Sequence, residues 1–176
     1  MQRGQIMKSN ELLLDAFGRI RETVEATLDG LDDGTLALRP AGTGNSIAWM
    51  VWHLARVEDV QVSDAAGTDE VWFAQDFLGR FGLPLRPRDT GYGHSSDQVD
   101  AVRAPAELLL EYYDAVHRQT VEFVQTLVDE DLDRVVDTRW NPPVTLGVRL
   151  VSTIADCLQH AGQAAYAKGL HRTPEE

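Results

Sequence analysis

Hydrophobic residues recur at three- and four-residue steps in four segments of the chain, and this spacing predicts four amphipathic helices. Their expected bounds are Ser9–Leu31, Ser46–Ala66, Pro105–Val128 and Thr145–Lys168. Each begins at a residue suited to a helix start, because Ser and Thr accept first-turn amides and Pro needs no amide there. No segment has a convincing strand pattern. We therefore expect an all-α four-helix bundle, forming a single domain over residues 1–176.

The connections between these helices are uneven in length and composition. The connection from the second to the third helix is long, and we expect a short helix within it at Glu70–Phe81. The connection before the fourth helix contains Trp140 and two prolines. Long, aromatic connections in a small bundle more often form lids or site walls than simple tethers.

The charge balance of the chain disfavours several classes of function. The 28 acidic residues exceed the 16 basic ones, for a net charge of −12, which disfavours nucleic acid and anionic membranes as partners. We find no apolar run long enough to span a membrane, and residues 1–10 lack the apolar core of a signal peptide. The lone cysteine, Cys157, allows no internal disulfide. These features indicate a soluble cytoplasmic protein.

Three residues are candidates for a metal site. Asp156 and His160 are four positions apart on the predicted fourth helix, so their side chains share a face. A solvated polar face is the simpler interpretation of this pair. If that face instead lines an opening, His53 from the second helix would complete a three-ligand site for zinc or another divalent metal. A boundary histidine that bonds a carbonyl is the alternative for His53.

Other catalytic constellations have less support. The sequence has no Gly-x-Ser-x-Gly motif and no glycine-rich phosphate loop. Cys157 falls on the apolar side of its helix, where we expect an inert, packed thiol. Glu58 lies within an apolar stripe and must find a partner or water. His171, in the tail, is expected to be solvated.

Two segments resemble the DinB-like metalloenzyme superfamily, namely WHLARVED at residues 52–59 and DCLQHAGQ at residues 156–163. That family is an up-down-down-up four-helix bundle, whose usual metal ligands are one histidine on the second helix and a His-x-x-x-His pair on the fourth. His53 and His160 match this pattern, and Asp156 replaces the first histidine of the pair. The resemblance implies a divalent metal, zinc in the first instance, while the carboxylate leaves the identity of the metal open.

Further motifs in the loops resemble the mycothiol S-transferases of actinobacteria. They are RFGL at 80–83, DTGYGH at 89–94, VRAP at 102–105 and WNPPVT at 140–145. This resemblance implies a metal-dependent detoxification enzyme that joins mycothiol, its co-substrate, to a small electrophile. The metal would favour the thiolate, which is the nucleophilic form of a thiol.

Five residues have candidate roles in such an enzyme. Tyr92 and His94, on a glycine-flanked loop, are candidate hydrogen-bonding or acid/base groups, although an exposed loop histidine is the alternative for His94. Trp140 is a candidate wall of the sugar site, or else a buried hinge residue. Arg56 and Arg149 are candidates for binding the thiol, or else they pair with the nearby carboxylates of Glu58, Asp59 or Asp156.

Two alternatives to the transferase remain open at this point. The first is a non-enzymatic ligand-binding or stress-associated bundle, and the second is an isomerase that uses a thiol as a cofactor. The oligomeric state also stays open between monomer and homodimer, because the small residues of the fourth helix permit close contact with either another helix of the chain or a second copy.

Overall fold

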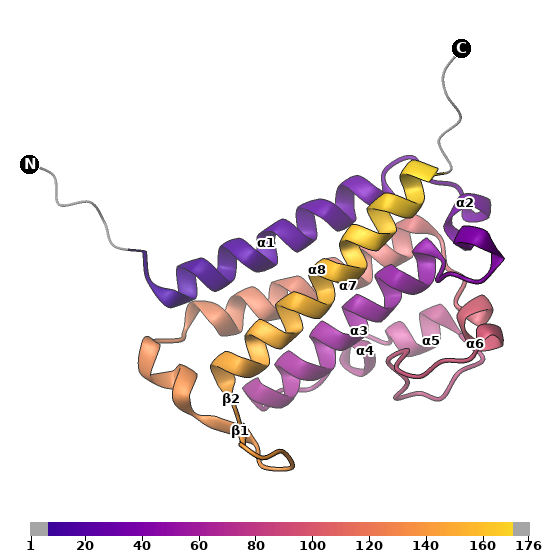
Figure 1. Ribbon diagram of the computed structural model, residues 1–176. Coiled ribbons are helices and arrows are strands. Elements are labelled where there is room, and N and C mark those ends of the chain that lie inside the picture. The colour runs from indigo at the N-terminus through magenta and orange to yellow at the C-terminus, as the bar shows by residue number, and fades with distance from the viewer. Residues whose placement is uncertain (1–6, 171–176) are drawn as a thin grey trace, which may run out of the picture.

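The computed structural model describes residues 7–170, and four long helices form its body (Figure 1). They are α1 (Ser9–Leu28), α3 (Ile47–Ala66), α7 (Ala106–Gln125) and α8 (Leu146–Leu170). Helices α1 and α8 run in one direction, and α3 and α7 run in the other. Both α1 and α3 pack on α7 and on α8, so that the four helices enclose a common core. This arrangement confirms the expected all-α bundle. His171, which we expected to be solvated, lies outside the described residues.

The observed helix ends follow the capping signals with small shifts. Oγ of Ser46 accepts a hydrogen bond from the amide of Trp49 at 3.2 Å, so Ser46 is the N-cap of α3 rather than its first residue. Gly67 ends this helix in the left-handed conformation. Helices α1 and α7 each end three residues earlier than expected, at Leu28 and Gln125.

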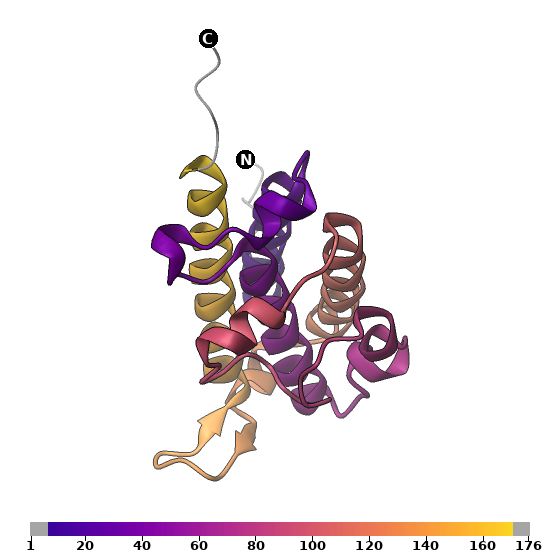
Figure 2. The same cartoon turned by 90° about the vertical axis from the view of Figure 1, so that its right-hand side faces the viewer.

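The connections contain several short elements, and most of them were not expected. The expected helix at Glu70–Phe81 is divided into two at Asp76, which adopts a positive φ of 54°. The strands β1 and β2 pair antiparallel in a hairpin that projects from one end of the bundle (Figure 2). The short elements are α2 (Asp33–Ala37), η1 (Pro40–Gly42), α4 (Val71–Ala74), α5 (Phe77–Phe81), α6 (Ser96–Ala101), η2 (Asp129–Asp133), β1 (Val135–Asp137) and β2 (Val144–Thr145).

Helix α3 is the central helix, because neighbours cover most of its circumference. Its polar residues Arg56, Glu58 and Asp59 are therefore as buried as its apolar ones. The hydroxyl of Tyr113 donates to Oε2 of Glu58 at 3.2 Å, which supplies the partner that this carboxyl requires. Within residues 7–170, no helix is long and apolar enough to cross a membrane.

Candidate metal site and adjoining cavity

The structure brings His53, Asp156 and His160 together where α3 crosses α8. One ligand atom from each side chain lies within 4.8 Å of the other two. Nε2 of His53 is 3.8 Å from Oδ2 of Asp156, and Nε2 of His160 is 3.9 Å from Oδ1 of the same carboxylate. These separations are too long for hydrogen bonds. They are close to the ~3.4 Å between neighbouring ligand atoms that tetrahedral zinc geometry gives with bonds of about 2.1 Å.

The hydrogen-bonding state of the three side chains also fits a divalent cation. Nδ1 of His53 donates to the carbonyl oxygen of Thr90, which leaves the Nε2 lone pair directed at Asp156. Burial lowers the pKa of His53, so the ring is neutral at pH 7, as a metal ligand must be. Oδ2 of Asp156 and Nδ1 of His160 are buried and have no hydrogen-bond partner among the described residues. The donor set is therefore two imidazoles and one carboxylate.

The loop at residues 89–94 holds the ring of His53 in this orientation. Trp49 stacks on His53, with 4.6 Å between the ring centroids. On another side of the ring lies Gly91, whose φ is 99° and where a Cβ would be only 2.7 Å from Nδ1. No larger residue fits there without displacing the loop or the ring. The glycine and the neighbouring carbonyl thus fix the tautomer and the position of His53.

A cavity of about 470 Å³ opens beside His53 and Asp156. Its walls come from α3, α8, the loop at residue 92 and the β1–β2 hairpin. Tyr92 and Trp140 form its rim and are 95% and 67% exposed. The other lining residues are Val57, Gln61, Thr90, Asp137, Arg139, Val144, Val148, Arg149, Ser152 and Thr153.

Arg149 is anchored at the floor of this cavity by two carboxylates. Its Nη1 donates to Asp64 at 3.0 Å, and its Nη2 lies 3.4 Å from Oδ2 of Asp137. Hydrogen bonds from the side chain and backbone of Arg139 hold the pKa of Asp137 well below its usual range. The cavity floor therefore carries a fixed array of donors and acceptors. Neither Asp137 nor Gln61 was among the sequence candidates, although Gln61 follows His53 by eight residues on α3 and so shares its face.

The remaining candidate residues do not line this cavity. His94 is buried beside Trp49, whose Nε1 donates to Nδ1 of His94 at 3.2 Å. Nε2 of His94 is 3.7 Å from a carboxylate oxygen of Asp89. The structure therefore places His94 behind the metal site, where it holds the tryptophan that stacks on His53.

Arg56 lies one turn after His53 on α3, is fully buried, and matches the alternative expectation of an ion pair. Its guanidinium donates to Asp59 at 3.3 Å and to Glu70 at 2.8 Å. It also donates to the hydroxyl of Tyr112 and to the carbonyl of Asp89. These contacts tie α3 to α7 and to the connection between those two helices.

The fold and this ligand set define a four-helix bundle with a candidate site of two histidines and one carboxylate that leaves positions open for substrate. The family model described as mycothiol-S-transferase matches residues 12–172, and the chain belongs to this family.

A comparison with solved structures supports the fold independently. The crystal structure of a conserved protein from Enterococcus faecalis superposes with a TM-score of 0.86 and 33% sequence identity. The match covers 94% of this chain and 98% of that chain. No curated protein matches the sequence significantly.

Proposed function

We propose that this protein is a metal-dependent S-transferase that conjugates mycothiol to small electrophiles. The observation that carries the proposal is the convergence of His53, Asp156 and His160 beside an open cavity, in a chain of the mycothiol S-transferase family. Three protein ligands suit a catalytic rather than a closed structural site.

The three side chains would hold the metal, for which zinc is our first choice. A divalent cation there supplies Lewis acidity, which lowers the pKa of a bound thiol and favours the thiolate at neutral pH. His53 presents the lone pair of its Nε2 because its Nδ1–H donates a hydrogen bond to the carbonyl oxygen of Thr90. Asp156 contributes a negative charge that offsets part of the charge of the cation. The role of this chain is to hold these donors in place before substrate arrives.

The cavity residues would bind and orient the two substrates. We assign Arg149 to the thiol, because Asp64 and Asp137 already fix its guanidinium at the cavity floor. We assign Trp140 and Tyr92, at the rim, to contacts with the incoming electrophile. His94 would act as a positioning residue through Trp49, and Arg56 as a structural one.

Metal analysis combined with a thiol assay tests this proposal. Protein purified without a chelating column should contain one divalent metal per chain and should consume mycothiol in the presence of 1-chloro-2,4-dinitrobenzene or monobromobimane. His160→Ala should lose both the metal and the activity, whereas His117→Ala, on α7 beside Tyr113, should keep both.

Several outcomes would contradict the proposal. Metal-loaded protein that leaves mycothiol unchanged with a panel of electrophiles is not the transferase proposed. Turnover without net loss of thiol would instead identify an isomerase. Saturable ligand binding that EDTA does not change, without turnover, would identify a binding protein.

A further inference from the structure

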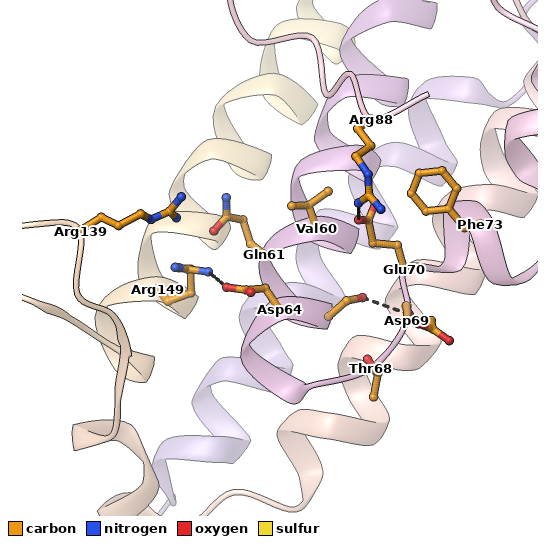
Figure 3. Close-up of a pocket in the computed structure, with 11 residues that line it drawn as sticks. Val60, Gln61, Asp64, Thr68, Asp69, Glu70, Phe73, Arg88, Arg139 and Arg149 are labelled. Atoms are coloured by element: carbon orange, nitrogen blue, oxygen red, sulfur yellow. Dashed lines mark hydrogen bonds and ion pairs between the residues drawn. The ribbon is translucent and has the colours of Figure 1, made fainter. Parts of the chain in front are cut away.

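A second cavity of about 570 Å³ lies next to the first, at the end of α3 (Figure 3). The two cavities share Gln61, Arg139 and Arg149 as lining residues, so they form a continuous groove. The part beyond Arg149 is called the distal groove here. Its residues are Val60, Ser63, Asp64, Thr68, Asp69, Glu70, Phe73 and Arg88.

The groove follows one face of α3 away from the candidate metal site. His53, Val57, Gln61 and Asp64 are separated by four- and three-residue steps and line the groove in this order. With a rise of 1.5 Å per residue, the distance along the helix from His53 to Asp64 is about 16 Å. A ligand with one end at the metal site can therefore reach the distal groove only if it is long.

The chemistry of the distal groove favours a neutral, hydroxyl-rich ligand. Asp64 pairs with Arg149 at 3.0 Å, and Glu70 pairs with Arg88 at 3.4 Å, as the close-up shows. Three acidic and three basic side chains line this cavity, so their charges balance and no net field selects an anion or a cation. The guanidiniums and carboxylates still offer many donors and acceptors, and hydroxyl groups can use both kinds.

The first cavity has a different character. Trp140, Val144 and Val148 give it an apolar side, which suits a small apolar electrophile better than a polyol. The two substrates of a transferase would thus occupy different parts of the groove.

We propose that the distal groove binds the uncharged, hydroxyl-rich end of the thiol substrate, while the sulfur of this substrate lies at His53, Asp156 and His160. This inference rests on the proposed function. Mycothiol has the required chemistry, because its cysteine sulfur is at one end and a sugar–inositol unit is at the other. The groove would then select this thiol over short thiols, which cannot reach from the metal site to Asp64, about 16 Å farther along α3.

Kinetics with a long and a short thiol test the proposal. The variant is Arg88→Ala, and the matched control is Arg86→Ala, an exposed arginine two positions away that lines neither cavity. Arg88→Ala should raise the KM for mycothiol about 3- to 10-fold, the range for loss of one hydrogen bond. The KM for N-acetylcysteine and for the electrophile should not change. Arg86→Ala should resemble the wild type with both thiols.

A second variant addresses the shape of the distal groove. Val60→Phe narrows it and should also raise the KM for mycothiol alone, with a thermal melt to show that the variant is folded. An equal rise in KM for both thiols, or an effect on the electrophile only, would overturn the proposal. An unchanged KM for mycothiol in Arg88→Ala would overturn it too.

Direct binding separates this inference from the proposed function. S-methyl mycothiol has no free thiol, and calorimetry should show that it binds the wild type and binds Arg88→Ala 3- to 10-fold more weakly. If this result is obtained but no thiol is turned over, the transferase proposal fails and the groove proposal stands. If mycothiol is turned over but Arg88→Ala binds the methylated thiol like the wild type, only the groove proposal fails.

Discussion

Nε2 of His53 faces Oδ2 of Asp156 at 3.8 Å across the contact between α3 and α8, too far for a hydrogen bond and close enough to share a cation. The two residues come from distant parts of the sequence, so only the folded chain can offer this pair. Asp156 also lies 3.9 Å from His160, which makes it the common neighbour of both imidazoles.

Asp156 is therefore the first residue to change. Asp156→Asn keeps the shape of the side chain but removes its charge. Loss of a residue that only supports a metal ligand typically weakens metal binding about 10- to 100-fold, and we expect at least this loss for a ligand itself. Asp156→His restores a strong zinc ligand and should bind zinc tightly. Competition with a fluorescent chelator measures both. Equal zinc affinity of the wild type and Asp156→Asn would contradict a role for this carboxylate in binding.

Gly91→Ala should disturb His53 directly. The new Cβ would lie 2.7 Å from Nδ1 of His53 and 2.9 Å from Cζ2 of Trp49, at a φ of 99°. We expect a loss of about 1–3 kcal/mol in the free energy of unfolding, measured by urea denaturation, and weaker zinc binding. Gly93→Ala is the matched control, because Gly93 also has a positive φ but faces open space. If both variants bind zinc equally, the contact with His53 has no part in holding the ring.

Glu58 should make the stability of the protein depend on pH. Burial raises its pKa to about 7. At a pH between its usual pKa and this value, the carboxyl therefore takes up a proton when the chain folds. The free energy of unfolding should therefore fall as pH rises from 5 to 8, by at most about 3 kcal/mol from this group. Glu58→Gln should remove this part of the slope in denaturant titrations. The exposed control Glu122→Gln should retain it, and a wild-type slope in Glu58→Gln would contradict the prediction.

Arg56→Ala distinguishes a structural from a substrate-binding role for this arginine. Removing the guanidinium leaves the buried Asp59 without its cation and Glu70 with only the exposed Arg88, and we expect a loss of about 3–5 kcal/mol in the free energy of unfolding. Below the melting temperature, the KM for mycothiol should stay unchanged. Arg149→Ala should instead raise this KM. An increase in KM for Arg56→Ala while the protein is folded would return Arg56 to the list of thiol-binding residues.

Cys157 should be inert in the folded protein. The thiol is fully buried, burial raises its pKa well above the usual range, and its Sγ contacts the carbonyl of Leu54 at 3.5 Å. Iodoacetamide should modify it only after unfolding, as mass spectrometry can show, and Cys157→Ala should retain transferase activity. Rapid alkylation of the folded chain would contradict this picture and would make the cysteine a source of error in assays with electrophiles.

The sequence predicted the four long helices well, because their periodicity and their capping residues agree. It could not predict the surroundings of Arg56, Glu58 and Asp59, since an amphipathic pattern assumes one polar side and α3 is covered almost all round. Partners from distant elements, such as Tyr112 and Tyr113, decide how these charges are accommodated. The hairpin was missed because strands of three and two residues are too short to show alternation.

The candidate site was predicted to different extents in helices and loops. The spacing of Asp156 and His160 is fixed by helix geometry, so their proximity follows from the sequence. In the loop, Tyr92 and His94 are two residues apart, yet Tyr92 reaches the cavity rim while His94 turns toward Trp49. Loop directions have no period, and they depend on contacts that only the fold defines.

Gly91 has no side chain, and this feature offers a criterion for comparing related sequences. A chain that keeps the three ligand positions but has a larger residue here cannot bring this loop down onto His53 in the same way. In such a chain, either another carbonyl must select the tautomer of the histidine or the loop must follow another path. The residue at position 91 therefore separates homologues that can hold this histidine in the same way from those that must hold it differently.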